Sequence, residues 1–258
     1  MLSDMQTLNL PTNPPVQAMP DDGIEDLTVY PDSDGQPMSD NTKQFDWIVL
    51  FKENLEILLA TNPDVFVAGD LLWYPIKGDN KTRLAPDTMV AFGRPKGDRG
   101  SYQQWKEGNI PPQVVFEVLS PGNRPSEMAR KLLFYERFGV EEYYIYDPDR
   151  NRLTGYQRGG KHLIEIPTMH NWVSPRLGIR FMHQPGNLEV FAPNGQKFLS
   201  PVEIDQRRQQ AEQRADRAES AQTQAIPKLQ ALGLTPEQIA DALGLPLDVV
   251  QQTIAGQV

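Results

Sequence analysis

Two carboxylates lie in apolar surroundings, where an ionised group is costly. Glu117 is in the middle of QVVFEVLS (residues 113–120), and Asp87 follows Pro86 in LAPDTMVAF (residues 84–92). A buried charge is tolerated when it is paired or binds a metal. Taken alone, Glu117 is equally well explained as a strand-end residue that reaches solvent or pairs with an arginine. Because two carboxylates in adjacent buried strands repel each other, we expect Asp87 and Glu117 to share a divalent cation.

The oxygen ligands indicate which ion and which reaction to expect. Carboxylate and carbonyl oxygens suit Mg²⁺, with Mn²⁺ as a substitute, and Mg²⁺ keeps several of its waters. A water on such an ion becomes more acidic and can attack a phosphodiester. Asp87 and Glu117 therefore predict metal-dependent hydrolysis of phosphodiester bonds.

Lys131 is the candidate for the cation that this reaction needs beside the developing phosphate charge. It lies early in the helix expected after the Glu117 strand. Glu127, Lys131 and Tyr135 are spaced at i, i+4 and i+8, so they share one helical face. The alternative is a surface ion pair between Glu127 and Lys131, which is worth only a few tenths of a kcal/mol.

The elements that must position these side chains follow from hydrophobic periodicity and from Gly and Pro breaks. The pattern predicts a helix at about 41–60, a meander of strands at 64–69, 70–76 and 84–92, a strand at 113–120, a helix at 126–138 and a strand at 141–147. A helix between two neighbouring parallel strands makes a right-handed crossover. The fold class expected is an α/β core ordered helix-strand-strand-strand-helix-strand, with a mixed sheet.

The net charge of −9 is unevenly distributed. Residues 1–40 hold eight acidic residues and no Lys or Arg, whereas residues 41–185 hold 19 basic and 17 acidic residues. The central region is therefore close to neutral and does not exclude a nucleic-acid partner. Four cations in one segment are candidate phosphate contacts: Arg94, Lys96, Arg99 and Lys106. A solvated loop would explain these four residues too.

Other features limit the compartment and the chemistry. The absence of cysteine excludes disulfides and thiolate zinc sites. The N-terminus lacks a signal-peptide pattern, and the longest apolar run, WIVLF, is too short to cross a bilayer. We therefore expect a cytoplasmic protein without a membrane partner. The spacing of His162, His170 and His183 argues against a histidine-based metal site.

The C-terminal region differs in composition from the rest of the chain. Residues 203–226 are polar and helix-favouring, and they carry a seam of alanines: Ala211, Ala215, Ala218, Ala221 and Ala225. This seam predicts a coiled coil and a homodimer. The alternative is a solvent-exposed helical linker. Pro227 is expected to interrupt this helix. Two short helices follow, and the second carries no Lys or Arg, which favours a small packing module over a DNA-reading helix-turn-helix.

Four segments in order resemble a known family. They are PD at 86–87, FEVLSP at 116–121, SEMARKLLFY at 126–135 and GVEEYYIYDP at 139–148. Over about 40–182 they resemble the restriction-endonuclease family that is abundant in cyanobacteria, within the PD-(D/E)XK nuclease superfamily. The resemblance implies that Asp87 and Glu117 are metal ligands. The superfamily's usual lysine position is Leu119 here, and Lys131 matches the helix position to which this family's lysine has moved.

The resemblance also implies supporting roles and a domain plan. Glu127 stands where relatives often carry an acid. The expected plan is an acidic Pro/Asp-rich segment at 1–40, a PD-(D/E)XK nuclease-like domain at 41–185, a linker at 186–202, a helical segment at 203–226 and a small helical module at 227–258. The function expected is a Mg²⁺-dependent endonuclease acting on DNA. The alternative is a catalytically silent module on the same fold that binds nucleic acid or protein.

Overall fold

The computed structural model describes residues 27–35 and 37–256, so residues 1–26 of the expected N-terminal segment lie outside the described residues. The chain forms two compact units, residues 1–198 and 199–258. In chain order, the first unit contains α1 (Thr42–Leu58), β1 (Val65–Ala68), β2 (Trp73–Tyr74), β3 (Thr88–Phe92), β4 (Tyr102–Gln103), a 3₁₀ turn (Gln104–Glu107), β5 (Val114–Val118), α2 (Pro125–Phe138), β6 (Glu142–Asp147), β7 (Arg152–Gly159), β8 (His162–Glu165), β9 (Trp172–Val173), β10 (Arg180–Gln184) and β11 (Asn187–Phe191).

The main sheet is mixed, as expected from the pattern. In the described part of the chain its six strands run in the order β1-β3-β5-β6-β7-β8. β3 is antiparallel to both β1 and β5, and β5 is parallel to β6, with α2 as the crossover between them. β5 is buried throughout and β3 is buried except at its last residue, because both faces of the sheet are covered. This is the predicted restriction-endonuclease-like order of helix, three strands, helix and strand.

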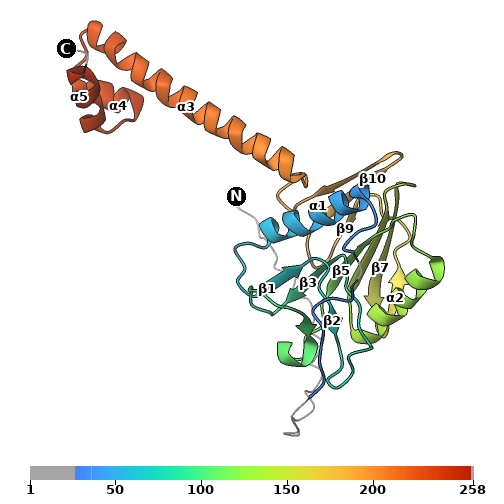
Figure 1. The fold of residues 1–258 in the computed structure, drawn as a ribbon. Helices are drawn as coiled ribbons and strands as arrows, with labels where there is room; N and C mark the ends of the chain where they lie inside the picture. The colour runs from blue at the N-terminus through green and yellow to red at the C-terminus, as the bar shows by residue number, and fades with distance from the viewer. Residues whose placement is uncertain (1–26, 36, 257–258) are drawn as a thin grey trace, which may run out of the picture. The chain divides into compact units, whose positions relative to one another are not determined.

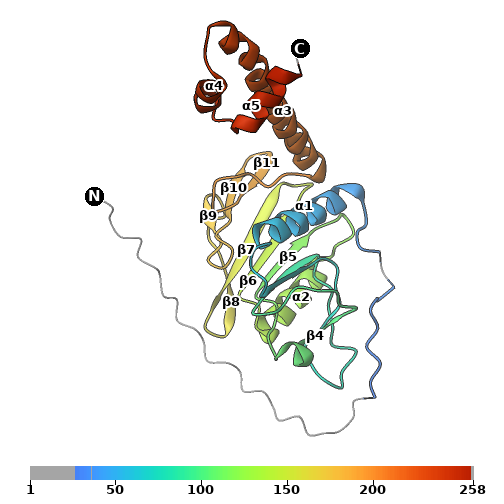
Figure 2. The same cartoon turned by 90° about the vertical axis from the view of Figure 1, so that its left-hand side faces the viewer.

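The two faces of the sheet are covered by different elements (Figures 1 and 2). On one face, α1 contributes Ile48, Phe51 and Leu55 to a core that also contains Phe116 from β5 and Phe181 from β10. α2 lies on the opposite face. Its ends suit the element, since Pro125 occupies the first turn and Gly139 closes the helix in the left-handed region at φ 95°. The site described below lies on the α2 side.

Segment 70–76 does not join the main sheet, so the expected three-strand meander is wrong at this point. β2 instead pairs in parallel with β4, and β1 pairs directly with β3. The fully buried Trp73 packs against Phe134, Tyr135 and Phe138 of α2. The apolar residues of this segment are therefore explained by packing under α2 rather than by sheet pairing.

The expected linker at 186–202 contains a strand. β11 pairs with β10 in a three-stranded sheet with β9, and Leu188 and Val190 are buried in the core. Alternation in NLEVF puts these two side chains on the same face of the strand. The first unit therefore extends to residue 198, beyond the boundary expected at 185.

The second unit consists of helices. α3 (Pro201–Ala231) begins with a capping box formed by Ser200 and Glu203, and it is followed by α4 (Pro236–Leu243) and α5 (Leu247–Ala255). α3 continues through Pro227, contrary to the expected interruption. Ile226 is buried with Ile239 of α4 and Val250 of α5, so packing holds the helix turns around Pro227.

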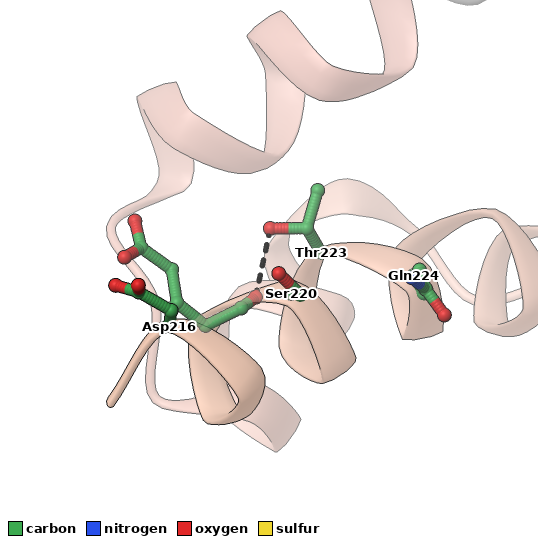
Figure 3. A pocket seen from close by; sticks show the side chains of 5 residues that line it. Asp216, Ser220, Thr223 and Gln224 are labelled. Carbon is green, nitrogen blue, oxygen red and sulfur yellow. Dashed lines mark hydrogen bonds between the residues drawn. The ribbon is translucent and has the colours of Figure 1, made fainter. Parts of the chain in front are cut away.

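Further up α3, the exposed surface is polar. An open hollow of about 440 Å³ is lined there by Asp216, Glu219, Ser220, Thr223 and Gln224. Figure 3 shows how the side chains of Asp216, Ser220, Thr223 and Gln224 lie along the helix. The Thr223 hydroxyl donates to the Glu219 carbonyl oxygen at 3.0 Å, within the same helix. All five residues that line this hollow are polar or charged, whereas small-molecule pockets are lined mainly by hydrophobic and aromatic side chains. No helix in the described part of the chain combines the length and hydropathy needed to cross a membrane.

Candidate active site

Strand register places Asp87 opposite Glu117. Thr88 pairs with Phe116 in the antiparallel β3–β5 ladder, so the next pair outward is Asp87 with Glu117. Directly opposed residues of an antiparallel pair project from the same face. The sequence predicted Asp87 within the strand, but it lies one residue before β3. Its Oδ2 accepts the Val118 backbone N–H at 2.6 Å. This hydrogen bond extends the ladder and fixes the Asp87 carboxylate beside Glu117.

The α2 side chains at i and i+4 both reach Glu117. The Lys131 ammonium lies 2.7 Å from Glu117 Oε2, and the Tyr135 hydroxyl donates to Glu117 Oε1. Glu117 is 2% exposed, and the Lys131 side chain is only 14% exposed. The ion pair is therefore between Lys131 and the strand carboxylate, and the alternative of a surface pair with Glu127 is wrong. Sequence spacing did identify the three-residue helical face correctly.

Burial and mutual charge shift the ionisation of this group of residues. Burial raises the pKa of Asp87 well above its usual range, and the negative charge of Glu117 adds to that effect. Burial alone would lower the pKa of Lys131, but the carboxylates of Glu117 and Asp87 outweigh it and the net pKa is raised. Lys131 is therefore a permanent cation at neutral pH. Burial and the Glu117 charge also raise the pKa of Tyr135, which keeps its proton.

Asp87, Glu117 and Lys131 line an open cleft of about 570 Å³. Glu127 lines it as well, and so do the cations Lys81, Arg83 and Arg130. The cleft is thus open to a large ligand, with the Asp87–Glu117–Lys131 group on its wall. Acidic side chains line it too, among them Asp34, Asp40 and Asp70, so a negatively charged ligand would be attracted at the cations and at a bound divalent ion rather than by the cleft as a whole.

Asp70 is a cleft residue that sequence reasoning missed. It adopts the left-handed backbone region at φ 49°, and its N–H donates to the Pro86 carbonyl oxygen at 3.1 Å, directly before Asp87. Burial raises its pKa, and the charges of Asp34 and Glu117 raise it further. The Gly69-Asp70 pair signals a turn, but its approach to Asp87 depends on a long-range contact that a local pattern does not contain.

Gln44 is a second missed residue, on α1. Its side-chain amide donates to the Val118 carbonyl oxygen at 2.8 Å, and its Oε1 accepts the Asp40 N–H at 2.8 Å. Gln44 is 6% exposed, so both bonds are shielded from water. The amide fixes the backbone of the residue that follows Glu117 and ties the start of α1 to the end of β5.

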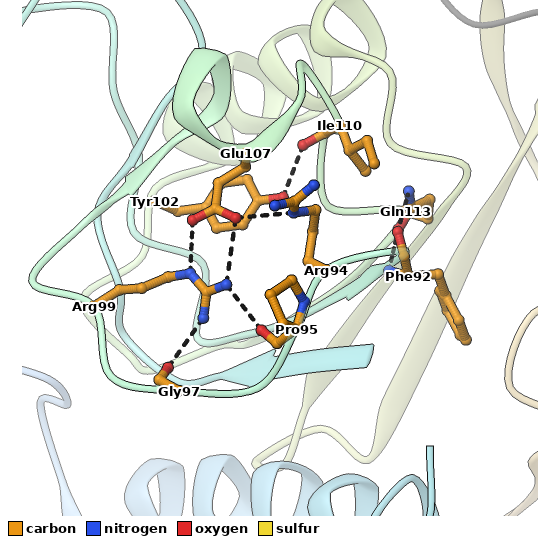
Figure 4. A network of polar contacts seen from close by, with 9 residues as sticks. All are labelled: Phe92, Arg94, Pro95, Gly97, Arg99, Tyr102, Glu107, Ile110 and Gln113. Atoms are coloured by element: carbon orange, nitrogen blue, oxygen red, sulfur yellow. Dashed lines mark hydrogen bonds and ion pairs between the residues drawn. The ribbon is translucent and has the colours of Figure 1, made fainter. Parts of the chain in front are cut away.

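The four cations expected to contact phosphate are largely engaged elsewhere. Figure 4 shows Glu107 accepting from Arg94 at 2.9 Å and from Arg99 at 2.7 Å, while Arg99 also donates to the carbonyl oxygens of Pro95 and Gly97. Arg99 further stacks over the Phe66 ring at 3.9 Å. Lys96 lies 3.6 Å from Glu56, and Lys106 is exposed. Arg94 and Arg99 thus organise the loop between β3 and β5.

The oxygen donors at the cleft suit a hard divalent cation. Asp87 and Glu117 offer carboxylate oxygens on the same face of the sheet, beside an open space. Mg²⁺ commonly binds through one or two carboxylates and keeps several waters. Within residues 27–35 and 37–256, no three or more His, Cys, Asp or Glu side chains are grouped so as to hold a metal ion. The two carboxylates therefore fit an ion whose other ligands are water and substrate oxygens, rather than one enclosed by protein.

Comparison with known proteins identifies the family. The model of the Uma2 family, described as "Putative restriction endonuclease", matches residues 37–182, and the chain belongs to this family. This match confirms the family resemblance that the four sequence segments indicated. It also supports the expected class of enzyme, a nuclease. The fold is also similar to a solved structure from Anabaena variabilis ATCC 29413, described as a "putative nuclease belonging to DUF820". That likeness has a TM-score of 0.40 and 13% identity, and it covers 52% of this chain and 72% of the other. No curated protein matches the chain.

Proposed function

We propose that the protein is a Mg²⁺-dependent endonuclease that hydrolyses DNA phosphodiester bonds. One observation carries this proposal: the Lys131–Glu117 pair at 2.7 Å lies on the wall of an open cleft, with Asp87 opposite Glu117 in the strand register. Two carboxylates and a cation are the groups that metal-assisted phosphodiester cleavage requires. Membership of the family supports a nuclease, and the donor set supports the choice of a hard cation.

Asp87 and Glu117 would hold the ion. When bound, Mg²⁺ supplies a more acidic water and neutralises charge on a phosphate. The raised pKa of Asp87 means that, in the metal-free protein, a proton competes with the ion for this carboxylate. The N–H of Val118 stabilises the charged carboxylate that the ion requires.

Lys131 and Tyr135 act on Glu117 and on the substrate. The Tyr135 hydroxyl fixes one oxygen of Glu117, which orients the carboxylate. Lys131 holds the other oxygen and keeps its charge, so its ammonium is available to a phosphate that enters the cleft. Glu127 contributes negative charge near Lys131 and supports its protonated form.

The alternative is a catalytically silent module that binds nucleic acid or protein. One observation favours it: both carboxylate oxygens of Glu117 already have protein partners. Each oxygen has a second lone pair, so ligation stays compatible with these hydrogen bonds. The two proposals differ in whether the carboxylates bind a divalent ion.

Calorimetric titration of Mn²⁺ into four proteins separates them: wild type, Asp87→Asn, Glu117→Gln and, as a control, Glu165→Gln at an exposed position of β8. We expect one site in the wild type and the control, and a large loss of affinity in each cleft variant. Plasmid cleavage with Mg²⁺ should likewise be retained in the wild type and the control and be lost in each cleft variant. Equal Mn²⁺ affinity in wild type and Glu117→Gln would end the shared-site proposal, and binding of DNA without cleavage would favour the silent module.

A further inference from the structure

A second hollow lies beside the cleft, between α2 and strands β6 and β7. Its volume is about 360 Å³, within the range of small-ligand pockets. Asn123 lines both the cleft and this second hollow, so the two lie next to each other. A polymer with one phosphodiester in the cleft could therefore place a neighbouring residue at the second hollow.

Much of the lining of this hollow is apolar. Leu119, Met128, Leu132, Ile145 and Tyr156 contribute to it. Leu119 lies two residues after Glu117 along the same strand direction, and alternation puts both side chains on one face. The strand thus presents a carboxylate to the cleft and then an aliphatic side chain to the adjacent hollow. Such a surface suits a flat, weakly polar group rather than a phosphate.

Arginines also line the hollow, and they come from two segments, the residue before α2 and the β6–β7 hairpin. Arg124 precedes α2, Arg150 lies in the β6–β7 turn and Arg152 begins β7. Arg124 and Arg152 are exposed. Arg150 pairs with Asp147 at 2.9 Å, yet its side chain is 78% exposed and its remaining donors are accessible. Guanidinium groups bind phosphate through two parallel hydrogen bonds and stack on planar rings.

We propose that this second hollow receives one unpaired nucleotide of the strand being cut, with its base on the apolar side chains and its phosphates on the arginines. This inference rests on the proposed function for the identity of the ligand. Bases in an intact duplex are stacked and paired, and extracting one costs free energy. The site therefore favours DNA that is single-stranded, or that carries an unpaired nucleotide, next to the bond that is hydrolysed.

The first test fills the hollow. Ala129 lines it and lies at an exposed position of α2, so Ala129→Trp should block the base with little effect on folding. Leu133→Trp is the matched control, since Leu133 is on the same helix, 65% exposed and outside this lining. Fluorescence anisotropy with EDTA compares a 12-nucleotide single strand with the corresponding 12-base-pair duplex. Ala129→Trp should weaken single-strand binding by about fivefold or more, the scale on which one stacked base contributes to affinity. Duplex binding should stay unchanged.

The second test removes charge. The double variant Arg124→Gln/Arg152→Gln should weaken single-strand binding and lower the slope of log affinity against log salt by about 0.7 for each phosphate that the protein no longer neutralises. Arg180→Gln, at an exposed position of β10, should change neither quantity. Thermal melting of every variant checks that the fold is retained.

The outcomes separate this inference from the proposed function. Wild-type preference for the single strand, abolished in Ala129→Trp and kept in Leu133→Trp, supports the nucleotide site even when plasmid cleavage is absent. Wild-type protein that binds the duplex at least as tightly as the single strand overturns it, even when Mg²⁺-dependent cleavage is observed. Unchanged affinity and salt slope in the arginine double variant overturn it as well.

Discussion

Lys131 has two roles at the level of single residues, because it is the proposed catalytic cation and also the partner of a buried carboxylate. Lys131→Met should lower cleavage by about a hundredfold or more, the usual effect of removing one electrostatic interaction with the transition state. It should also lower the free energy of unfolding by about 1–3 kcal/mol, because Glu117 is 2% exposed and would be left without its counter-charge. Initial cleavage rates at saturating Mg²⁺ and urea unfolding measure the two effects.

Lys131→Arg is the control that keeps the positive charge but not the shape of the lysine side chain. It keeps the positive charge but changes donor geometry, so we expect partial cleavage and most of the stability. The proposal would be falsified by a Lys131→Met protein that cleaves DNA at the wild-type rate.

Tyr135 and Tyr143 offer a matched pair of buried hydroxyls. Both side chains are fully buried, and their rings pack edge to face with centroids 4.8 Å apart. The Tyr135 hydroxyl donates to Glu117, whereas the Tyr143 hydroxyl has no hydrogen-bond partner among the described residues. Tyr135→Phe should therefore destabilise the fold by about 1.5–3 kcal/mol, while Tyr143→Phe should be neutral or stabilising. Urea unfolding of the two variants tests this, and similar destabilisation in both would contradict the assigned role of Tyr135.

The sequence was sufficient to propose the main groups of the site, because each one breaks a local pattern. Asp87 and Glu117 are charges in apolar segments, and Lys131 follows from helical spacing. The pairing of Lys131 with Glu117 rather than Glu127 required the crossover geometry of β5 and α2. Asp70 and Gln44 were missed because their positions depend on interactions between distant segments.

At the level of elements, long and strongly patterned segments were predicted well. α1, β5, α2 and β6 lie where periodicity and the Pro and Gly boundaries indicated. The sheet pairing of β2 was mispredicted and β11 was missed, for opposite reasons. The segment around Trp73 is as apolar as a core strand but packs under α2, whereas β11 is short and half-buried, so it resembles a linker.

The loop between β3 and β5 gives a test of the Arg94–Arg99–Glu107 network. Arg99 is 12% exposed, makes an ion pair with Glu107 and stacks on Phe66. Arg99→Gln should therefore lower the free energy of unfolding by about 1–3 kcal/mol while leaving the salt dependence of DNA binding unchanged. Lys106→Gln, at an exposed position, is the control for stability. A stable Arg99→Gln protein with a reduced salt slope would return Arg99 to the phosphate-binding residues.

Glu142 of β6 connects the main sheet to the turn before β10. It is 2% exposed and accepts hydrogen bonds from the Ser174 and Tyr144 hydroxyls and from the Arg176 N–H at 2.7 Å. Burial raises its pKa above the usual 4.5, so the native state binds this proton more tightly than the unfolded chain does. Its contribution to stability should therefore fall as pH rises from about 4.5 through the raised pKa.

Glu142→Gln removes this titration. The difference in free energy of unfolding, wild type minus variant, should decline over that pH window by at most about 1.4 kcal/mol per pH unit. Urea unfolding at a series of pH values measures the difference. A difference that is constant, or that grows with pH, would show that burial does not govern this carboxylate.

At the level of the whole molecule, the acidic segment precedes the candidate chemistry in the chain but also reaches the cleft, since Asp34 and Asp40 line it. The eight acidic residues of 1–40 precede the catalytic candidates, which all lie within the family match at 37–182 and in the first unit. Truncation within the second unit should therefore leave the chemistry of cleavage intact. It becomes a test of assembly rather than of catalysis.

The alanine seam of α3 underlies the prediction of a homodimer. Ala211, Ala215, Ala218 and Ala221 are exposed, and a polar helix of 31 residues gains little stability from its own chain. Pairing with a second copy would bury the seam, and two-fold symmetry would supply one active site for each DNA strand. Light scattering should give about twice the 29.1 kDa chain mass for the full protein and the monomer mass after truncation at Pro201. Ala215→Glu/Ala218→Glu should dissociate the full chain in the same way. The truncated protein and the double variant should each nick a supercoiled plasmid, whereas the wild type should convert it to the linear form. An unchanged oligomeric state after truncation would show that α3 is a linker only.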